Sequence, residues 1–121
     1  MKHTAKIALY HNPRCSKSRE ALKLLHEQGI EPEIILYLET PPDAASLKQL
    51  LAKLGIGARA LLRKGEDAYK QLGLADETLS EAALIEAMVK HPKLIERPIA
   101  VKGQIALIGR PPENVLQLLN R

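Results

Sequence analysis

Three segments within the first 38 residues constrain the fold of this chain more than any other feature. Residues 7–10 predict a strand, residues 16–28 predict an amphipathic helix, and residues 34–38 form an apolar run typical of a buried strand. Gly29 is placed to end the helix in a left-handed conformation. A strand, a helix and a strand joined by short links form a βαβ unit, which is right-handed in nearly all folds.

The remaining residues predict a helical block followed by two strands and a helix. In the helical block, leucines recur with helical spacing, and Thr78 with Glu81 has the spacing of a capping box. Residues 99–101 and 105–108 predict two antiparallel strands around a turn, and a final helix follows. The order βαβ, helical block, ββα is that of an α/β, thioredoxin-like fold with a helical insertion between its halves.

Composition limits both the core and the compartment. The chain has no Trp, no Phe and three Tyr, so its core must be built from aliphatic side chains. Its single cysteine cannot form an intramolecular disulfide, which fits a reducing compartment. The first residues show no apolar leader segment, and no apolar run approaches membrane-spanning length. We therefore expect a soluble cytoplasmic protein folded as a single domain over residues 1–121.

The formal net charge of +4 favours a negatively charged ligand or surface as partner. The basic residues do not form one long run, and the chain has few aromatic residues that could stack on bases. We therefore expect neither nucleic acid nor a membrane as partner. A localised site for a small anion fits the charge better.

Cys15 stands where the first predicted strand ends and the first predicted helix begins. The amides and the dipole of a helix start favour an anion there, and so favour the thiolate over the thiol. Arg14, Lys17 and Arg19 add positive charge nearby. Because the thiolate is the nucleophilic form of cysteine, Cys15 is a candidate catalytic residue. The alternative is that Cys15 is a small buried apolar residue.

Arg63, Arg97 and Arg110 stand out by their sequence context. Arg63 follows an apolar turn, whereas Arg97 and Arg110 each precede a proline. In the expected fold, all three arginines could approach Cys15. Guanidinium groups form bidentate hydrogen bonds to tetrahedral oxyanions, which lysine cannot reproduce. A thiolate beside such a cluster would attack an oxyanion; the alternative is three solvated surface arginines.

Four motifs of this sequence resemble those of the glutaredoxin-coupled arsenate reductase family, the ArsC family. They are His-Asn-Pro-Arg-Cys-Ser-Lys-Ser-Arg at 11–19, Ala-Leu-Leu-Arg-Lys at 60–64, Glu-Arg-Pro-Ile at 96–99 and Gly-Arg-Pro-Pro at 109–112. The match spans nearly the whole chain in order and in spacing. Arg14 before the cysteine departs from the plasmid-encoded members and resembles the short chromosomal branch.

The resemblance implies a reaction. Cys15 would attack arsenate, and Arg63, Arg97 and Arg110 would bind the oxyanion and its thiol adducts. No bound cofactor is implied. Glutathione would be the co-substrate, and glutaredoxin would be the partner that resolves the mixed disulfide, so that arsenate is reduced to arsenite.

The resemblance also implies roles for three supporting residues. His11 would influence the ionisation of the cysteine as a catalytic residue, and Ser18 would stabilise the thiolate. Thioredoxin-like folds place a structural cis-proline just before the third strand, which is where Pro98 stands. We therefore expect the peptide bond before Pro98 to be cis.

Other thiol chemistries fit the sequence less well. Low-molecular-weight phosphatases need Cys-x5-Arg, but Ala21 occupies that arginine position. Dithiol oxidoreductases need Cys-x-x-Cys, but Ser18 occupies the second cysteine position. A regulatory protein of the same fold that binds RNA polymerase is the alternative function, although such proteins typically carry Cys-x-x-Cys and lack these arginines. The four histidines show no metal-ligand spacing, so we expect no metal site.

Overall fold

The structure, a computed structural model, describes residues 6–120. The N-terminal segment, in which we expect no apolar leader, lies almost wholly outside these described residues. Contacts divide the chain into two compact units: one runs up to Thr40 and resumes at Arg97, and the other is Pro41–Glu96. The second unit is the expected helical insertion. That residues 1–121 fold as a single domain stays a prediction. Within residues 6–120, no helix is both long and apolar enough to cross a membrane.

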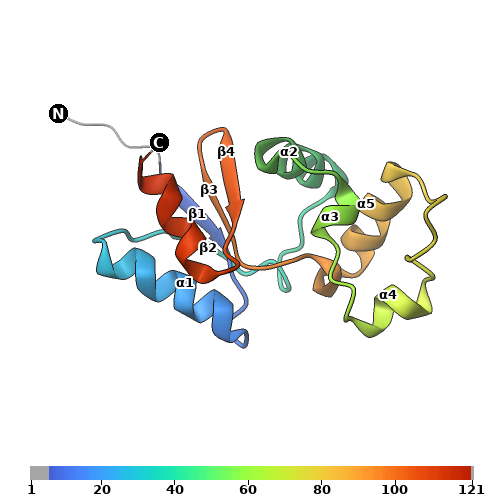
Figure 1. The fold of residues 1–121 in the computed structure, drawn as a ribbon, viewed down its shortest axis with the longest axis horizontal. Helices are drawn as coiled ribbons and strands as arrows, with labels where there is room; N and C mark the ends of the chain where they lie inside the picture. Colours follow the sequence, from blue (N-terminus) through green and yellow to red (C-terminus); the bar gives the residue numbers. More distant parts are fainter. Residues whose placement is uncertain (1–5, 121) are drawn as a thin grey trace. The chain divides into compact units, whose positions relative to one another are not determined.

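A four-stranded mixed sheet forms the centre of the first unit (Figure 1). Its strands, in the spatial order β2-β1-β3-β4, are β1 (Ile7–Tyr10), β2 (Glu33–Ile35), β3 (Ile99–Lys102) and β4 (Ile105–Ile108). β1 pairs parallel with β2 and antiparallel with β3, and β3 pairs antiparallel with β4. The parallel pair β1–β2 and the hairpin β3–β4 belong to the two halves of a thioredoxin-like fold. The predicted fold class is therefore confirmed.

Two helices of the first unit pack against each other and against the sheet (Figure 1). They are α1 (Ser16–Glu27) and the 3-10 helix η2 (Pro112–Asn120). Gly29 follows α1 with a φ of 76°, as its sequence position predicts. The core between helices and sheet is aliphatic, as expected, and is made of Ile7, Leu9, Ala21, Leu25, Ala100, Val115 and Leu118.

The apolar run at residues 34–38 is not a buried strand, and this prediction was wrong. β2 ends at Ile35 because the chain turns at Leu36, whose carbonyl accepts hydrogen bonds from the amides three and four residues later. Ile34 and Leu38 are 40% and 37% exposed, and β2 lies at the edge of the sheet. An apolar run alone does not distinguish a central strand from an edge strand followed by a turn.

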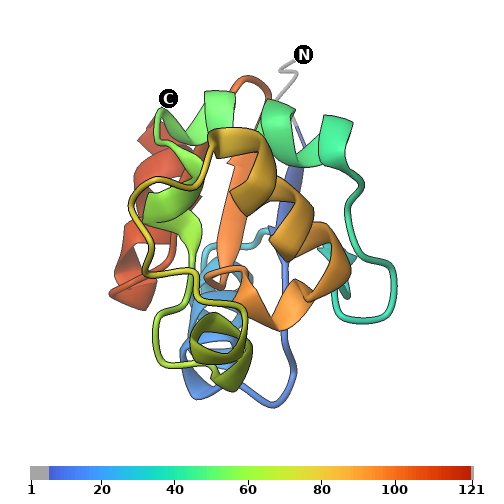
Figure 2. The ribbon, with the colours of Figure 1, turned by 90° about the vertical axis from the view of Figure 1, so that its right-hand side faces the viewer.

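The second unit consists of helices, which Figure 2 shows face-on. They are α2 (Ala44–Leu54), α3 (Ala58–Leu61), α4 (Asp67–Gln71), α5 (Glu81–Lys90) and the 3-10 helix η1 (Pro92–Leu94). α5 packs against α2, α3 and η1. The predicted leucine stripe lies on α2, where Leu47, Leu50 and Leu51 are buried.

The capping box predicted at Thr78 and Glu81 is wrong. The N-cap of α5 is Ser80, whose hydroxyl accepts a hydrogen bond from the amide three residues later at 3.1 Å. Thr78 instead donates its hydroxyl to Oδ1 of Asp76 at 2.6 Å. The carboxylate of Glu81 accepts a hydrogen bond from the amide of Ala58, at the start of α3, at 2.7 Å. Ser and Thr cap helices almost equally well, so local sequence did not decide between them.

Candidate active site

The loop between β1 and α1 places Cys15 at the start of the helix. The carbonyl oxygen of Asn12 accepts a hydrogen bond from the Cys15 amide at 2.9 Å, and its Oδ1 accepts one from the Arg14 amide at 3.0 Å. The amide of His11 donates to the carbonyl oxygen of Ile35 at 2.9 Å and ties the loop to β2. These bonds close a turn and leave Cys15 as the N-cap residue of α1, with an extended backbone.

The thiol of Cys15 is nearly buried, and its pKa lies below the ordinary value. Burial raises this pKa, but the backbone amide of Ser18, the side chain of Arg97 and the backbone amide of Lys17 together lower it by more. The first amides of a helix have no carbonyl partner within it, so they are available to the sulfur. The site therefore favours the thiolate, which is the nucleophilic form.

The groups that lower this pKa differ from those expected from the sequence. Arg14 is exposed, and Lys17 contributes through its backbone amide. The guanidinium of Arg19 donates from Nη1 to the carbonyl oxygen of Pro13 at 2.8 Å. The side chain that lowers this pKa is that of Arg97, which is distant from Cys15 in sequence.

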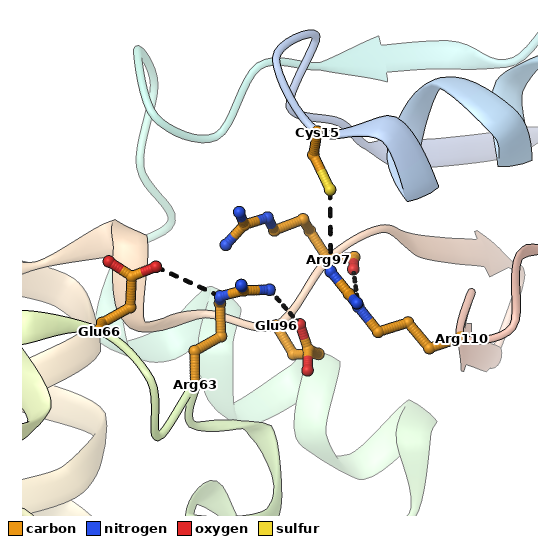
Figure 3. Close-up of polar contacts among 6 residues, drawn as sticks. All are labelled: Cys15, Arg63, Glu66, Glu96, Arg97 and Arg110. Carbon is orange, nitrogen blue, oxygen red and sulfur yellow. Dashed lines mark hydrogen bonds and ion pairs between the residues drawn. The ribbon is translucent and has the colours of Figure 1, made fainter.

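Two arginines act on Cys15: Arg97 lowers the pKa of its thiol, and Arg110 contacts its sulfur, as the dashed line in Figure 3 shows. Nη2 of Arg110 lies 3.7 Å from Sγ of Cys15, a hydrogen-bonding distance for sulfur. Nε of Arg110 donates to the carbonyl oxygen of Arg97 at 2.8 Å, which fixes the orientation of the guanidinium. The structure thus brings two of the three expected arginines to the thiol, and oxyanion binding by them stays a prediction.

The prolines beside these arginines shape the backbone at the site. The Arg97–Pro98 bond is cis, as the sequence predicts, and the Arg110–Pro111 bond is also cis, which sequence reasoning did not predict. The amide of Gly109 donates to the carbonyl oxygen of Pro98 at 2.8 Å. A Cβ atom on Gly109 would lie 2.8 Å from Cγ of Pro98, so only glycine leaves room for this close approach.

Arg63 lies in the helical unit, where two carboxylates hold its guanidinium (Figure 3). Nη1 of Arg63 donates to Oε1 of Glu96 at 2.6 Å, and Nε lies 3.4 Å from Oε2 of Glu66. All three side chains are partly buried. Sequence reasoning did not foresee either carboxylate, and the participation of Arg63 in the same site as Cys15 stays a prediction.

His11 and Ser18 form a buried polar pair beside the loop. Nδ1 of His11 lies 2.6 Å from Oγ of Ser18, and the amide of Asn12 donates to the same Oγ at 3.0 Å. Burial and then the charge of Arg19 lower the pKa of His11, so its ring is neutral near pH 7. Because Ser18 also presents its amide to Cys15, one residue connects the imidazole to the thiol. The catalytic roles of both residues stay predictions.

Sequence reasoning missed Asn12, which organises the loop. Its amide, its carbonyl oxygen and its Oδ1 each form a hydrogen bond within the segment from Asn12 to Ser18. Asn-Pro is a turn signal, so the sequence did contain a pointer to this residue. Replacing the side chain would leave the Arg14 amide without this acceptor.

The arrangement combines an activated nucleophile with donors for an anion. The Cys15 thiol and the guanidinium groups of Arg97 and Arg110 meet at the start of α1. In general, a thiolate attacks an electrophilic centre and guanidinium groups bind oxyanions. In the part of the chain that the structure describes, no group of three or more His, Cys, Asp or Glu side chains could hold a metal ion.

Comparison with known proteins identifies the family. The model of the ArsC family matches residues 10–118. The chain belongs to the ArsC family. The resemblance carried by the four sequence motifs is therefore confirmed.

Individual ArsC relatives align with nearly the whole chain. The uncharacterized protein YfgD of Escherichia coli strain K12 is 62% identical over 117 residues, which cover 96% of this chain and 98% of that protein. An arsenate reductase of Neisseria meningitidis serogroup A is 49% identical over 114 residues, covering 93% of this chain and 97% of that protein. The solved structure of an arsenate reductase from Vibrio cholerae has a TM-score of 0.92 and 52% identity, covering 96% of this chain and 99% of that one.

Proposed function

We propose that this ArsC protein is an arsenate reductase that converts arsenate to arsenite. The observation that carries the proposal is the Arg110 guanidinium 3.7 Å from the sulfur of Cys15. The lowered pKa of the Cys15 thiol supports it. Relatives named arsenate reductases, which align with 93% of this chain, support the choice of substrate.

In the first step, the Cys15 thiolate attacks the arsenic atom of arsenate. A sulfur–arsenic(V) bond forms, and one arsenate oxygen leaves as water after protonation. Arg97 and Arg110 hold the remaining oxygens and neutralise the charge of the adduct. The same role for Arg63 rests on its place in the family motif. His11 and Ser18 support the thiolate through the Ser18 amide.

In the second step, glutathione supplies the electrons. Its thiolate attacks Sγ of Cys15, the sulfur–arsenic bond breaks, and the electron pair of that bond stays on arsenic, which becomes arsenic(III). Cys15 is left in a mixed disulfide with glutathione. The chain has no second cysteine to resolve this disulfide, so an external thiolate must do it, and we assign this step to glutaredoxin. A reducing cytoplasm supplies both partners.

Intact-protein mass spectrometry combined with a turnover assay tests this sequence of steps. With arsenate and glutathione but no glutaredoxin, the protein should accumulate a glutathione adduct at Cys15. Adding glutaredoxin should release the adduct and start multiple turnovers. Cys15→Ser should form no adduct. If no arsenate-dependent adduct forms in the wild type, a binding or regulatory protein of the same fold becomes the better explanation.

A matched pair of arginine variants tests the oxyanion site. Arg110→Lys keeps the charge but loses the fork that bonds both the Arg97 carbonyl and the Cys15 sulfur. A lost charge-assisted bond costs about 1.5–3 kcal/mol, so kcat/KM for arsenate should fall roughly ten- to a hundredfold. Arg14→Lys changes an exposed arginine next to Cys15 and should have little effect. Equal effects of the two variants would argue against the proposed oxyanion site.

A further inference from the structure

Asn12 holds the turn that leads from β1 to Cys15, and it is only 9% exposed. Its Oδ1 accepts a hydrogen bond from the amide of Arg14, two residues later, at 3.0 Å. Its carbonyl oxygen accepts one from the amide of Cys15, three residues later, at 2.9 Å. An asparagine side chain bonded to the amide two residues on forms an Asx turn, so the side chain and the main chain of Asn12 close the same turn. The proposed steps at the thiol give Asn12 no role.

The backbone amides around Cys15 fall into two groups. Those of Arg14 and Cys15 donate to Asn12. Those of Lys17 and Ser18, the second and third residues of α1, stabilise the Cys15 thiolate. The side chain of an N-cap residue lies where it can receive these two amides. The turn at Asn12 therefore separates the amides that hold the loop from the amides that act on the sulfur.

The turn also sets how the sulfur meets the start of α1. Cys15 has φ −97° and ψ 123°, so the backbone is extended at this residue and becomes helical only at Ser16. The sulfur makes no full capping hydrogen bond. Its stabilisation by the Lys17 and Ser18 amides therefore depends on how closely the turn presents it to them, because the favourable field of a helix start fades within the first turn.

A third hydrogen bond ties Asn12 to the other side of the thiol. The amide of Asn12 donates to Oγ of Ser18 at 3.0 Å, and Nδ1 of His11 lies 2.6 Å from the same oxygen. Asn12 is thus bonded to the residues on both sides of Ser16, before the helix and in its first turn. A connected set of buried hydrogen bonds holds its members in one arrangement.

We propose that Asn12 is a positioning residue for the reaction at Cys15, because its side chain locks the turn that presents the sulfur to the first amides of α1. It acts through Cys15 and not on the oxyanion. The inference deepens the proposed function and rests on it for the reaction at the thiol.

Alkylation of Cys15 by iodoacetamide at a series of pH values tests the role of Asn12 without arsenate. Asn12→Ala removes Oδ1 and should raise the midpoint by roughly 0.5–1 pH unit, the net effect of about one hydrogen bond. Asn12→Ser restores an oxygen that can accept from the Arg14 amide, so its midpoint should return towards the wild-type value. Asn12→Leu keeps the branched shape without an acceptor, and it takes the place of Asn12→Ala if that variant does not fold.

Two results of this titration would overturn the proposal. One is a wild-type midpoint in the variants that lack the acceptor. The other is a midpoint in Asn12→Ser as high as in Asn12→Ala. These substitutions change no charge, so a shift cannot come from lost charges. The side chains that they leave in place are Arg97 and Arg110 from distant segments, and His11, Arg14, Lys17 and Arg19 near Cys15 in sequence.

Asp76→Ala is the matched control, because Asp76 forms the same kind of turn in the second unit. Its Oδ1 accepts a hydrogen bond from the amide of Thr78, two residues later, at 2.9 Å. Asp76→Ala should lower the free energy of unfolding and leave the Cys15 midpoint unchanged. An equal rise of the midpoint in Asp76→Ala and Asn12→Ala would mean that general loosening explains the shift, and the proposal would fail.

Arsenate turnover separates the positioning role from the proposed function. Below the midpoint, Asn12→Ala should lower kcat/KM for arsenate roughly three- to tenfold, since a smaller fraction of Cys15 is thiolate. Above the midpoint of the variant the loss should disappear, and a loss that is equal at every pH would refute the positioning role. A protein that shows the alkylation shift without arsenate turnover refutes only the proposed function. A protein that reduces arsenate but shows no alkylation shift refutes only the role of Asn12.

Discussion

At Cys15, burial and hydrogen bonding act on the same thiol in opposite directions. Burial disfavours the charged thiolate and raises its pKa, whereas the amides of Ser18 and Lys17 and the guanidinium of Arg97 stabilise the thiolate. The pKa ends below its ordinary value, so the stabilising contacts outweigh burial. The site therefore favours the thiolate form of a cysteine that is largely shielded from water.

Alkylation kinetics test this balance. The rate of iodoacetamide modification of Cys15 against pH should have its midpoint below the value of about 8.5 for a free cysteine. Arg97→Gln should raise the midpoint, because it removes the cation that stabilises the thiolate. Arg14→Gln, which changes an exposed neighbour, should leave it unchanged. A wild-type midpoint at about 8.5 would contradict the assignment of an activated thiol.

The sequence predicted part of this site and could not predict the rest. Helix-start chemistry pointed to Cys15, and the arginine–proline pairs pointed to Arg97 and Arg110. The Glu66 and Glu96 carboxylates that hold Arg63 were not foreseen, because an acidic residue in sequence shows no partner until the chain is folded. For the same reason, the sequence analysis gave too much weight to the side-chain charges of Arg14, Lys17 and Arg19, which are close to Cys15 in sequence but are not the side chain that lowers its pKa.

At the scale of elements, periodic segments were predictable and single boundaries were not. β1, α1, α2 and the β3–β4 hairpin follow their apolar patterns, because each pattern repeats over a whole element. The end of β2 and the N-cap of α5 each depend on one hydrogen-bonded position. The final helix was predicted in place, but it is wound as a 3-10 helix.

Gly109 lies between the end of β4 and Arg110 of the candidate active site. Replacing Gly109 tests how closely it packs against Pro98. Gly109→Ala would put a Cβ 2.8 Å from Cγ of Pro98 and 3.0 Å from Cγ1 of Val115. Overpacking of this kind costs about 1–3 kcal/mol, which urea unfolding would measure. Gly65→Ala is the control, since a Cβ there has no neighbour within 4 Å. Equal stability of the two variants would contradict the close packing.

At the scale of the whole molecule, the helical unit Pro41–Glu96 separates the two segments of the first unit in sequence. The strands of those two segments are nevertheless hydrogen-bonded in one sheet. β1 pairs with β3 across the insertion, with Leu9 opposite Ala100. The entropic cost of closing a loop grows only slowly with its length, so an insertion of this size leaves the pairing of the two halves favourable. The order of elements in the sequence predicted this arrangement, because βαβ, helical block, ββα is the order of a thioredoxin-like fold with a helical insertion between its halves.

The titrating groups with shifted pKa values make the stability of the protein depend on pH. Burial lowers the pKa of His11, and local hydrogen bonds lower those of Asp43 and Asp76. The pKa of Cys15 is also lowered, whereas burial raises that of Tyr10. A lowered pKa in the folded state adds stability above the unfolded-state pKa, and this stability is lost as the pH falls. For Tyr10 the loss comes as the pH rises above about 10.

Cys15→Ser isolates the contribution of the thiol to this dependence. Serine does not titrate, so the difference in free energy of unfolding between wild type and variant should be constant below the folded-state pKa of Cys15. Above that pKa the difference should grow in favour of the wild type, until the unfolded-state cysteine also ionises at about 8.5. Each unit of pKa shift corresponds to about 1.36 kcal/mol, a difference that urea unfolding at a series of pH values resolves. Parallel stability curves for the two proteins would mean that the folded structure does not stabilise the thiolate, and the nucleophile would then have to be activated by the substrate itself.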